Sequence, residues 1–184
     1  MQEVIKVVGL GGSLSAASTS LAALRIALEG ALEAGAEVQL MDIKELDLPM
    51  FQSGMETPEA ALRLVQAAGE AHGMIWSSPL YHGTISGSFK NAVDWLDLLR
   101  GSDPPFLADK IIGLISTAGG MQGLQAVNTM EFMTRSLRAW AVPLVLPISQ
   151  AWQAFDERGQ LRDPKIDAQV RLLGRDSIFV MLIR

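Results

Sequence analysis

Apolar residues follow two alternating patterns along this chain, short continuous runs and longer stretches with the spacing of a helix face. The short runs are rich in valine and isoleucine, which is typical of strands buried on both sides. They predict strands at residues 3–9, 37–42, 73–77, 110–116 and 143–147. The longer stretches repeat apolar side chains every three or four residues. They predict helices at residues 18–34, 58–71, 87–100 and 122–140, and a last helix from residue 164.

Five strands that alternate with five helices predict a parallel sheet with helices on both faces, a three-layer α/β sandwich. For five strands we expect the doubly wound order 2-1-3-4-5. Ligands of such sheets bind beyond the carboxyl ends of the strands, at the switch point between the first and third strands. A length of 184 residues without repeats, linkers or low-complexity segments predicts a single domain over residues 1–184.

Composition and charge narrow the function classes. Hydrophobic residues make up 49% of the chain and charged residues 19%, the balance of a globular protein. The net charge of −5 argues against a nucleic-acid partner. The absence of cysteine excludes disulfides, thiolate catalysis and cysteine-ligated metals, and the two histidines lack metal-binding spacing. Because no signal-peptide pattern or membrane-spanning apolar run occurs, we expect a cytoplasmic protein without a membrane partner.

The stretch 7–20, VVGLGGSLSAASTS, is the first candidate for a functional site. It passes from an apolar strand through three glycines into the start of a helix, where free N–H groups and the helix dipole favour an anion. Hydroxyl groups add hydrogen-bond donors at Ser13, Ser15, Ser18, Thr19 and Ser20. Because the stretch has no lysine or arginine, neutral donors would hold a phosphate there. The alternative is a purely structural role, since the same residue types cap helices and turn chains.

The glycine spacing decides which phosphate ligand suits this stretch. A dinucleotide-binding fingerprint needs a third glycine where Leu14 stands after Gly9 and Gly11, and a Walker A loop needs a lysine. A small phosphate monoester, cradled by amides and hydroxyls, remains. Asp42 ends the second predicted strand, where a nicotinamide-binding domain uses an acid to hold a ribose hydroxyl. Without the third glycine, we expect Asp42 to serve a loop or a helix cap.

Two further loops have the composition of ligand loops. One follows the third predicted strand, at residues 77–95, and the other follows the fourth, at residues 116–123. Both are rich in glycine and hydroxyl residues, so they present backbone amides with little side-chain bulk. Because all three loops lie at the carboxyl edge of the expected sheet, they predict one site, with a phosphate at the first loop and a flat heterocycle at the other two.

These motifs resemble the NADPH-dependent FMN reductase family of flavodoxin-like proteins, which includes quinone, chromate and azo reductases. GSLxxxS at 12–18 resembles the phosphate loop of that family. SPxY at 78–81, followed by GxxKNAVDW at 87–95, resembles its ring loop and third helix and is the most specific motif. Gly119 and Gly120 resemble its second ring loop, and the resemblance spans essentially the whole chain.

The resemblance implies a flavodoxin-like fold with bound FMN, hydride transfer from NADPH or NADH, and transfer of electrons to a second acceptor. The residues implied to hold the FMN phosphate are Ser13, Ser18 and Ser20. Those implied to border the isoalloxazine ring are Pro79, Leu80, Tyr81 and His82. Those implied to approach its polar edge are Thr117, Gly119 and Gly120. Because the flavin carries the chemistry, we expect no catalytic side chain and no metal.

Four positions depart from the family pattern. Ser15 stands where relatives often have arginine, and Ser20 where they often have asparagine. Loss of the arginine removes a charge-assisted contact of roughly 1.5–3 kcal/mol, so we expect FMN to be held more weakly and to exchange as a substrate. Leu80 replaces an acid that many members have, and His82 replaces an asparagine. His82 has two interpretations, a hydrogen bond to the flavin or substrate and a cap of its own loop.

The third predicted helix has an expected structural role. We expect Lys90, Asn91 and Asp94 to fix this helix to the ring loop, and Trp95 to lie in the core or at a dimer interface. Family members commonly pair through this region, so the resemblance implies a homodimer or a homotetramer.

Three function classes stay open. The first is a reductase with ping-pong kinetics that passes electrons to flavin, quinone, azo or metal-oxyanion acceptors. The second is a non-catalytic FMN electron carrier of the flavodoxin type, which the serine- and alanine-rich phosphate loop and the few aromatic residues in the ring loops disfavour. The third is a flavin-free nucleotide-binding regulatory domain on the same fold, because a fold does not decide a function.

Overall fold

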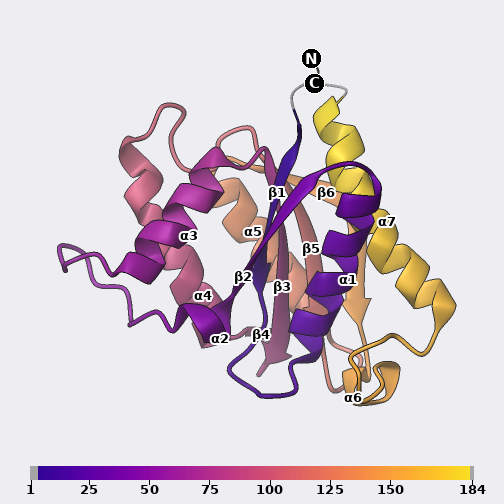
Figure 1. The fold of residues 1–184 in the computed structure, drawn as a ribbon. Coiled ribbons are helices and arrows are strands. Elements are labelled where there is room, and N and C mark those ends of the chain that lie inside the picture. The colour runs from indigo at the N-terminus through magenta and orange to yellow at the C-terminus, as the bar shows by residue number, and fades with distance from the viewer. Residues whose placement is uncertain (1–3, 183–184) are drawn as a thin grey trace.

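A parallel sheet forms the middle layer of the fold, with helices on both of its faces (Figure 1). The structure, a computed structural model, describes residues 4–182. Its parallel strands are β1 (Lys6–Gly11), β2 (Glu37–Asp42), β3 (Gly73–Tyr81), β5 (Ile111–Thr117) and β6 (Trp140–Ile148). They lie in the order β2-β1-β3-β5-β6, and a short strand, β4 (Thr84–Ile85), pairs antiparallel with β3. The predicted order 2-1-3-4-5 is confirmed, with β4 as an unpredicted addition.

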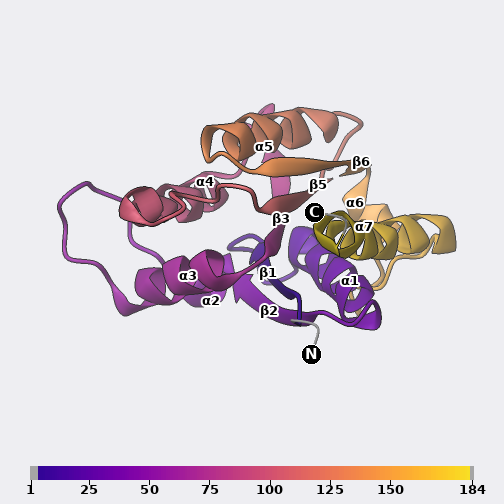
Figure 2. The same ribbon diagram turned by 90° about the horizontal axis from the view of Figure 1, so that it is seen from above.

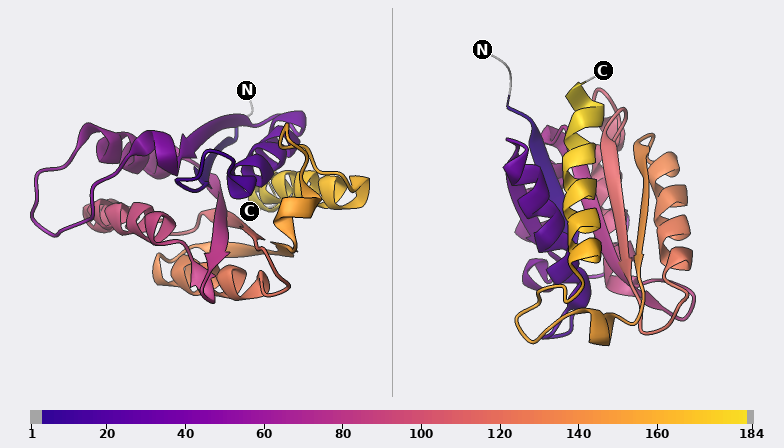
Figure 3. Two further views of the ribbon diagram at one scale, coloured as in Figure 1. Left: turned by 90° about the horizontal axis from the view of Figure 1, so that it is seen from below. Right: turned by 90° about the vertical axis from the view of Figure 1, so that its right-hand side faces the viewer.

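The helices divide between the two faces of the sheet (Figures 2 and 3). One face is covered by α1 (Thr19–Glu33) and α7 (Pro164–Leu182). The other is covered by α3 (Glu59–Glu70), α4 (Gly87–Asp94) and α5 (Leu124–Ser136), and α4 continues into a 3-10 helix, η1 (Trp95–Gly101). Two one-turn helices, α2 (Ile43–Leu46) and α6 (Ala151–Ala154), follow β2 and β6. No helix within residues 4–182 is long and apolar enough to cross a membrane.

The central strands bury side chains on both faces, as their continuous apolar runs predict. In β3, Trp76 points toward α4, where its ring meets Phe89 edge-on with 5.8 Å between centroids. The neighbouring Ile75 belongs to the opposite cluster, together with Leu24 of α1 and Leu173 of α7. The sheet is therefore held from both sides, and the carboxyl ends of its strands lie at one common edge.

Helices α1 and α7 approach each other so closely that glycine is needed on each of them. A Cβ at Gly174 would lie 2.0 Å from the backbone oxygen of Ala27, and a Cβ at Gly30 would lie 2.2 Å from that of Arg171. Arg171 also forms an ion pair with Glu29 of α1 at 2.8 Å. The two glycines and the ion pair therefore fix α7 against α1.

The charges around Glu33 predict how stability depends on pH. The hydrogen bond from Arg175 holds the pKa of Glu33 below its ordinary value of 4.5, and the charge of Arg171 lowers it further. A carboxyl pKa lowered by folding stabilises the protein above the unfolded-state pKa, and this contribution is lost as pH falls through the folded-state pKa. We therefore expect Arg175→Gln to lose less stability than the wild type between about pH 6 and about pH 3.5. Urea unfolding at both pH values measures the difference, and equal losses would contradict the prediction.

The helix predicted at 122–140 is too long. It corresponds to α5, which ends before Arg138, and Trp140 begins β6 instead. Arg138 has a φ of 66°, and the N–H of Ala139 donates to the carbonyl of Thr134 at 3.0 Å. This is a helix end that usually takes glycine in the left-handed position. Because arginine occupies the position, the sequence contains no glycine to signal the end.

Other boundaries differ less. The predictions for α1, β2 and the start of α7 agree with the structure within one residue. The strand predicted at 73–77 continues to Tyr81, and the strand predicted at 143–147 begins earlier, at Trp140. The helix predicted at 87–100 changes to 3-10 geometry after Asp94.

Candidate functional site

The three predicted ligand loops meet at the carboxyl edge of the sheet, at the bottom of Figure 1 and facing the viewer in the left panel of Figure 3. Hydrogen bonds connect their starting points. The N–H of Gly12 donates to the carbonyl of Ser77 at 3.1 Å, and the hydroxyl of Ser77 donates to the carbonyl of Ser20 at 2.8 Å. The hydroxyl of Thr19 donates to that of Thr117 at 3.3 Å. The ends of β1, β3 and β5 and the start of α1 therefore form one connected region.

Glycine is required where β1 meets β3. A Cβ at Gly11 would lie 2.3 Å from the backbone oxygen of Ser77, so no other residue allows this approach of the strands. Gly12 follows with a φ of 101°, in the left-handed region that favours glycine. These two residues turn the chain sharply at the end of β1, toward the N-terminus of α1.

A cluster of serine hydroxyls lies at the start of α1. Ser18 caps the helix by accepting a hydrogen bond from the N–H of Leu21 at 3.2 Å. Its hydroxyl also lies 3.1 Å from that of Ser20, which is buried. Ser13 is buried and accepts a hydrogen bond from the N–H of Ser15 at 3.4 Å. Ser18 therefore caps the helix. One proton of the Ser18–Ser20 pair lies between the two hydroxyls, and the other proton of the pair and that of Ser13 can donate at a helix end that favours anions.

Two arginines lie near this helix start, although the stretch 7–20 has none. A cavity of about 350 Å³ is lined by Ser18 and Thr19 on one side and by residues 155–160 on the other. Arg25 and Arg158 also line it. Neither arginine was predicted from the sequence to lie here, because one lies further along α1 and the other lies in a distant loop. Only the packing of that loop against α1 brings them together.

The ring loop after β3 is a β-hairpin and not an irregular loop. Pro79 is buried, Leu80 is half-buried, and Tyr81 is 51% exposed in the pairing with β4. His82 and Gly83 form the two-residue turn, with φ values of 48° and 87°, as tight hairpins require. His82 is exposed at this turn. Its place in the turn supports the loop-forming interpretation, and a contact with flavin or substrate stays a prediction.

The loop after β5 is held in place at its base and is open at its tip. Thr117 is buried, and the N–H of Ala118 donates to the carbonyl of Ile148 at 2.9 Å. Gly119 and Gly120 are exposed, and a Cβ on either would meet nothing within 4 Å. The two glycines therefore border open space beside the hairpin, as the predicted contact with a flat ring requires.

Helix α4, the third of the predicted helices, is fixed to the segment after α2 and not to the ring loop. The side-chain oxygen of Asn91 accepts from the N–H of Phe51 at 2.8 Å, and its amide group donates to the carbonyl of Pro49 at 3.0 Å. The indole N–H of Trp95 donates to the same carbonyl at 3.0 Å. Asn91 therefore fixes α4 to the segment after α2, and the expectation that it fixes α4 to the ring loop was wrong. Trp95 is 1% exposed and belongs to the core.

Lys90 and Asp94, which were also expected to fix α4 to the ring loop, lie at the surface. Lys90 and Asp94 form an ion pair along α4, with both side chains partly exposed. Such exposed pairs within a helix contribute little to stability.

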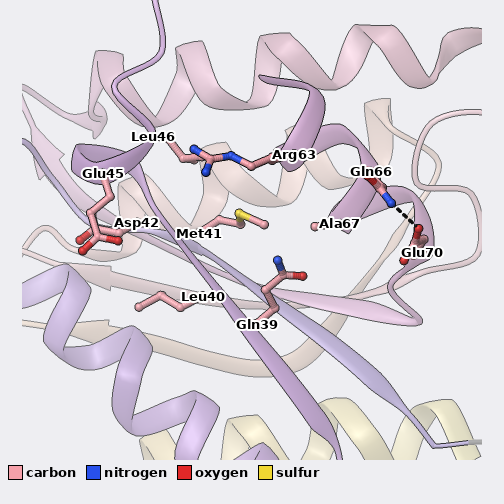
Figure 4. Close-up of a pocket in the computed structure, with 10 residues that line it drawn as sticks. All are labelled: Gln39, Leu40, Met41, Asp42, Glu45, Leu46, Arg63, Gln66, Ala67 and Glu70. Carbon is pink, nitrogen blue, oxygen red and sulfur yellow. Dashed lines mark hydrogen bonds between the residues drawn. The ribbon is translucent and has the colours of Figure 1, made fainter. Parts of the chain in front are cut away.

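A larger cavity, of about 500 Å³, lies between β2 and α3 (Figure 4). It is lined by Met41, Leu46 and Ala67 and, at its rim, by Arg63 and other polar side chains. The cavity has none of the glycines or hydroxyls of the three loops, so its volume does not make it the predicted site. No sequence pattern predicts this cavity, because it arises where α3 lies over the edge strand β2.

Asp42 lies at one end of that cavity and has the expected capping role. Its carboxylate accepts a hydrogen bond from the N–H of Lys44 at 2.9 Å and caps α2. The same oxygen would lie 3.2 Å from a Cβ at Gly12, which adds a second reason for glycine there.

Three features define a flavodoxin-like protein: the strand order, the close contact of β1 with β3 at Gly11, and the helix start lined by hydroxyls. Proteins of this doubly wound class bind ligands at the switch point between these two strands. The model of the NADPH-dependent FMN reductase family matches residues 5–153. The chain belongs to this family, so the predicted resemblance is confirmed.

Individual relatives agree with this family. The NADPH-dependent FMN reductase ArsH of Rhizobium meliloti is 32% identical over 128 residues, which are 70% of this chain and 52% of that protein. The chain thus spans about half the length of that relative. An NAD(P)H-dependent FMN reductase of Pseudomonas aeruginosa is 30% identical over 173 residues, 90% of this chain and 89% of that protein.

A solved structure confirms the fold. The flavoenzyme FerB, an NAD(P)H:(acceptor) oxidoreductase from Paracoccus denitrificans, matches with a TM-score of 0.78 and 19% sequence identity. The match covers 98% of both chains. At this identity the similarity concerns the fold alone, and it confirms the flavodoxin-like three-layer sandwich.

Proposed function

We propose that this chain is an NAD(P)H-dependent FMN oxidoreductase that binds FMN at the carboxyl edge of the sheet. The observation that carries the proposal is that three features meet in one region. They are a helix start lined by hydroxyls, the close contact of β1 with β3 at Gly11, and the open loop of Gly119 and Gly120. The acceptors proposed for the electrons are flavin, quinone, azo and metal-oxyanion compounds. The whole chain, residues 1–184, is proposed to form one FMN-binding domain.

The residues of this region fit both ends of FMN. At the phosphate end, Ser13, Ser18 and Ser20 provide hydroxyls beside the positive end of the α1 dipole, with Ser15 and Thr19 near them. At the ring end, the space beside Gly119 and Gly120 is open, which suits a planar ring bound by backbone amides. The phosphate loop itself has no basic residue, and Arg25 and Arg158 line only the neighbouring cavity, which supports weak binding, so FMN is proposed to exchange as a substrate.

The chain's own role is to bind, orient and stabilise charge. FMN, when bound, supplies the capacity to take up a hydride and release electrons. The amides of Gly119 and Gly120, with the hydroxyl of Thr117, are proposed to stabilise negative charge at the polar edge of the ring. Pro79, Leu80, Tyr81 and His82 are proposed to border the ring. No side chain is assigned a proton transfer.

The site is accessible from one side, which predicts that its two substrates bind at the same place in turn. Because the exposed glycines and the exposed Tyr81 leave one side accessible, NAD(P)H and the second acceptor are proposed to use the same place in turn. At saturating FMN, double-reciprocal plots of initial rates are then parallel, as ping-pong kinetics require. Intersecting lines would show that both substrates bind together.

The first experiment is an absorbance spectrum of the purified protein, alone, with FMN, and then with NADPH in the absence of oxygen. Flavin bands that bind to the protein and bleach faster than free FMN support the reductase. Bound flavin that NADPH does not bleach supports the alternative of a flavodoxin-type electron carrier. A protein that binds no flavin would be assigned to the third class, a flavin-free nucleotide-binding regulatory domain.

Substitution of Ser18 tests the phosphate assignment. We expect Ser18→Ala to weaken FMN binding by about 1–2 kcal/mol, through loss of a hydroxyl donor. Because Ser18 also caps α1, the variant should lose about 1 kcal/mol of unfolding free energy. Isothermal titration and urea unfolding measure the two effects.

A second helix cap is the matched control for Ser18. Asp163 accepts a hydrogen bond from the N–H of Lys165 at 2.8 Å at the start of α7. Asp163→Ala should cost about the same stability and leave the FMN affinity unchanged. An FMN affinity that Ser18→Ala leaves unaltered would place the phosphate elsewhere.

We also propose a homodimer or homotetramer in the cytoplasm. Large exposed apolar side chains support self-association, among them Phe132 at 72% and Trp152 at 68% exposed. The net charge of −5 supports a small-molecule partner over nucleic acid. Light scattering at several protein concentrations tests the assembly, and a monomer at all of them would exclude it.

A further inference from the structure

Two threonine hydroxyls connect loops that were assigned to opposite ends of FMN. Thr19 is the first residue of α1, in the phosphate loop, and Thr117 is the last residue of β5, before the second ring loop. The hydroxyl of Thr19 donates to that of Thr117, with 3.3 Å between the oxygens. Thr19 is half-buried and Thr117 is 2% exposed, so the hydrogen bond is partly buried.

The direction of this bond decides which protons are free. A hydroxyl has one proton to donate and two lone pairs that accept. Since Thr19 directs its proton to Thr117, it does not direct that proton to a phosphate. Thr117 acts as acceptor in this bond and keeps its own proton for another group. The hydroxyls of Ser18 and Ser20 lie 3.1 Å apart, so one of their two protons is shared within the pair and the other can be donated at the phosphate end.

Both partners are held by the backbone around them. The turn that carries Thr19 is tied to β3, because the hydroxyl of Ser77 donates to the carbonyl of Ser20 at 2.8 Å. Thr117 pairs with Ile148 in the sheet. Threonine is branched at Cβ, which restricts its χ1 angle. The hydroxyl pair is therefore a defined link between the helix start and the second ring loop.

We infer that Thr19 is a positioning residue for Thr117 and not a ligand of the FMN phosphate. By donating to Thr117, it orients the Thr117 hydroxyl so that the remaining proton is available to the polar edge of the flavin ring. The inference rests on the proposed function, because it requires flavin at this site. It also reassigns Thr19 from the phosphate end of the site to the ring end.

Riboflavin separates the two roles, because it has the ring and ribityl chain of FMN but no phosphate. We expect Thr19→Val, which keeps the side-chain shape, to weaken FMN and riboflavin by the same factor, about 3- to 10-fold. A phosphate ligand would affect FMN alone. Ser20→Ala is the matched control at the phosphate end and should weaken FMN more than riboflavin. Quenching of flavin fluorescence measures all four affinities.

A double-mutant cycle tests whether Thr19 acts through Thr117. Thr117→Val should weaken both ligands, and Thr19→Val should add no further loss in that background. Thr19→Ser keeps the hydroxyl and should restore both affinities. The reduction potential of bound FMN should become more negative in Thr19→Val, because the reduced ring loses a donor. A merely structural role would leave that potential unchanged.

The outcomes separate this inference from the proposed function. A wild-type protein that binds neither flavin overturns both. Loss of FMN affinity with unchanged riboflavin affinity in Thr19→Val makes Thr19 a phosphate ligand and overturns the inference alone, as do additive losses in the cycle. Thermal unfolding of the ligand-free variants verifies that they fold. If Thr19→Val does not fold, Thr19→Ala is compared with Thr19→Ser in the same way.

Discussion

Gly174→Ala is expected to destabilise the protein, although alanine is the better helix former. The added Cβ would lie 2.0 Å from the backbone oxygen of Ala27 and 2.9 Å from the backbone nitrogen of Ala31. Backbone atoms cannot rotate away as side chains do, so α1 and α7 must separate. Such overpacking costs about 3 kcal/mol, and helix propensity returns about 1 kcal/mol. We therefore expect a net loss of about 2 kcal/mol of unfolding free energy, measured by urea unfolding.

Gly69→Ala is the matched control in another helix. Gly69 lies in α3, and a Cβ there would meet Leu99 at 3.4 Å, an ordinary contact. Without a clash, only the helix propensity changes, so this variant should gain about 0.5–1 kcal/mol. The two substitutions thus have opposite expected signs. If Gly174→Ala were also stabilising, the close approach of α1 and α7 would be disproved.

Gly11→Ala is expected to remove flavin binding together with stability. Its Cβ would lie 2.3 Å from the backbone oxygen of Ser77, the oxygen that accepts the hydrogen bond from Gly12. To relieve the clash, β1 and β3 must separate, which displaces the phosphate loop from α1. We expect FMN affinity to fall by at least about 100-fold and the unfolding free energy to fall by about 3 kcal/mol. Fluorescence titration and urea unfolding measure these effects.

Gly101→Ala is the control for this variant. Gly101 ends η1, has no positive φ, and a Cβ there would meet nothing within 4 Å. We expect its stability to change by less than about 0.5 kcal/mol, with unchanged FMN affinity. If Gly11→Ala bound FMN as tightly as Gly101→Ala does, the close contact of β1 with β3 at Gly11 would have no role in FMN binding.

The predicted sheet order was correct because its signals are local. Each strand is a short apolar run, and the alternation with helices restricts the connections to a few topologies. The phosphate loop was also visible locally, since Gly11, Gly12 and Ser18 lie within eight residues. The cap formed by Ser18 follows from the same short stretch.

Contacts between distant segments were not visible in the same way. Asn91 binds the segment at 48–51, and Thr19 binds Thr117 across 98 positions of the chain. No pattern in either segment indicates its partner. The end of α5 was missed for a related reason. Arg138, and not glycine, takes the left-handed conformation after the helix, and its carbonyl accepts a hydrogen bond from the N–H of the distant Asp109 at 3.2 Å.

The sequence by itself determined the fold class and the three loops that meet at the switch point, because backbone preferences and hydrophobic periodicity act over a few residues. The family followed from the resemblance of its loop motifs and not from periodicity. Only the tertiary structure decided which groups the side chains of Thr19 and Asn91 bond to and why glycine is needed at Gly11 and Gly174. The cavity between β2 and α3 also became visible only in the tertiary structure. These features depend on distances between segments far apart in the chain, and such distances follow from the packing of helices against the sheet rather than from local preference.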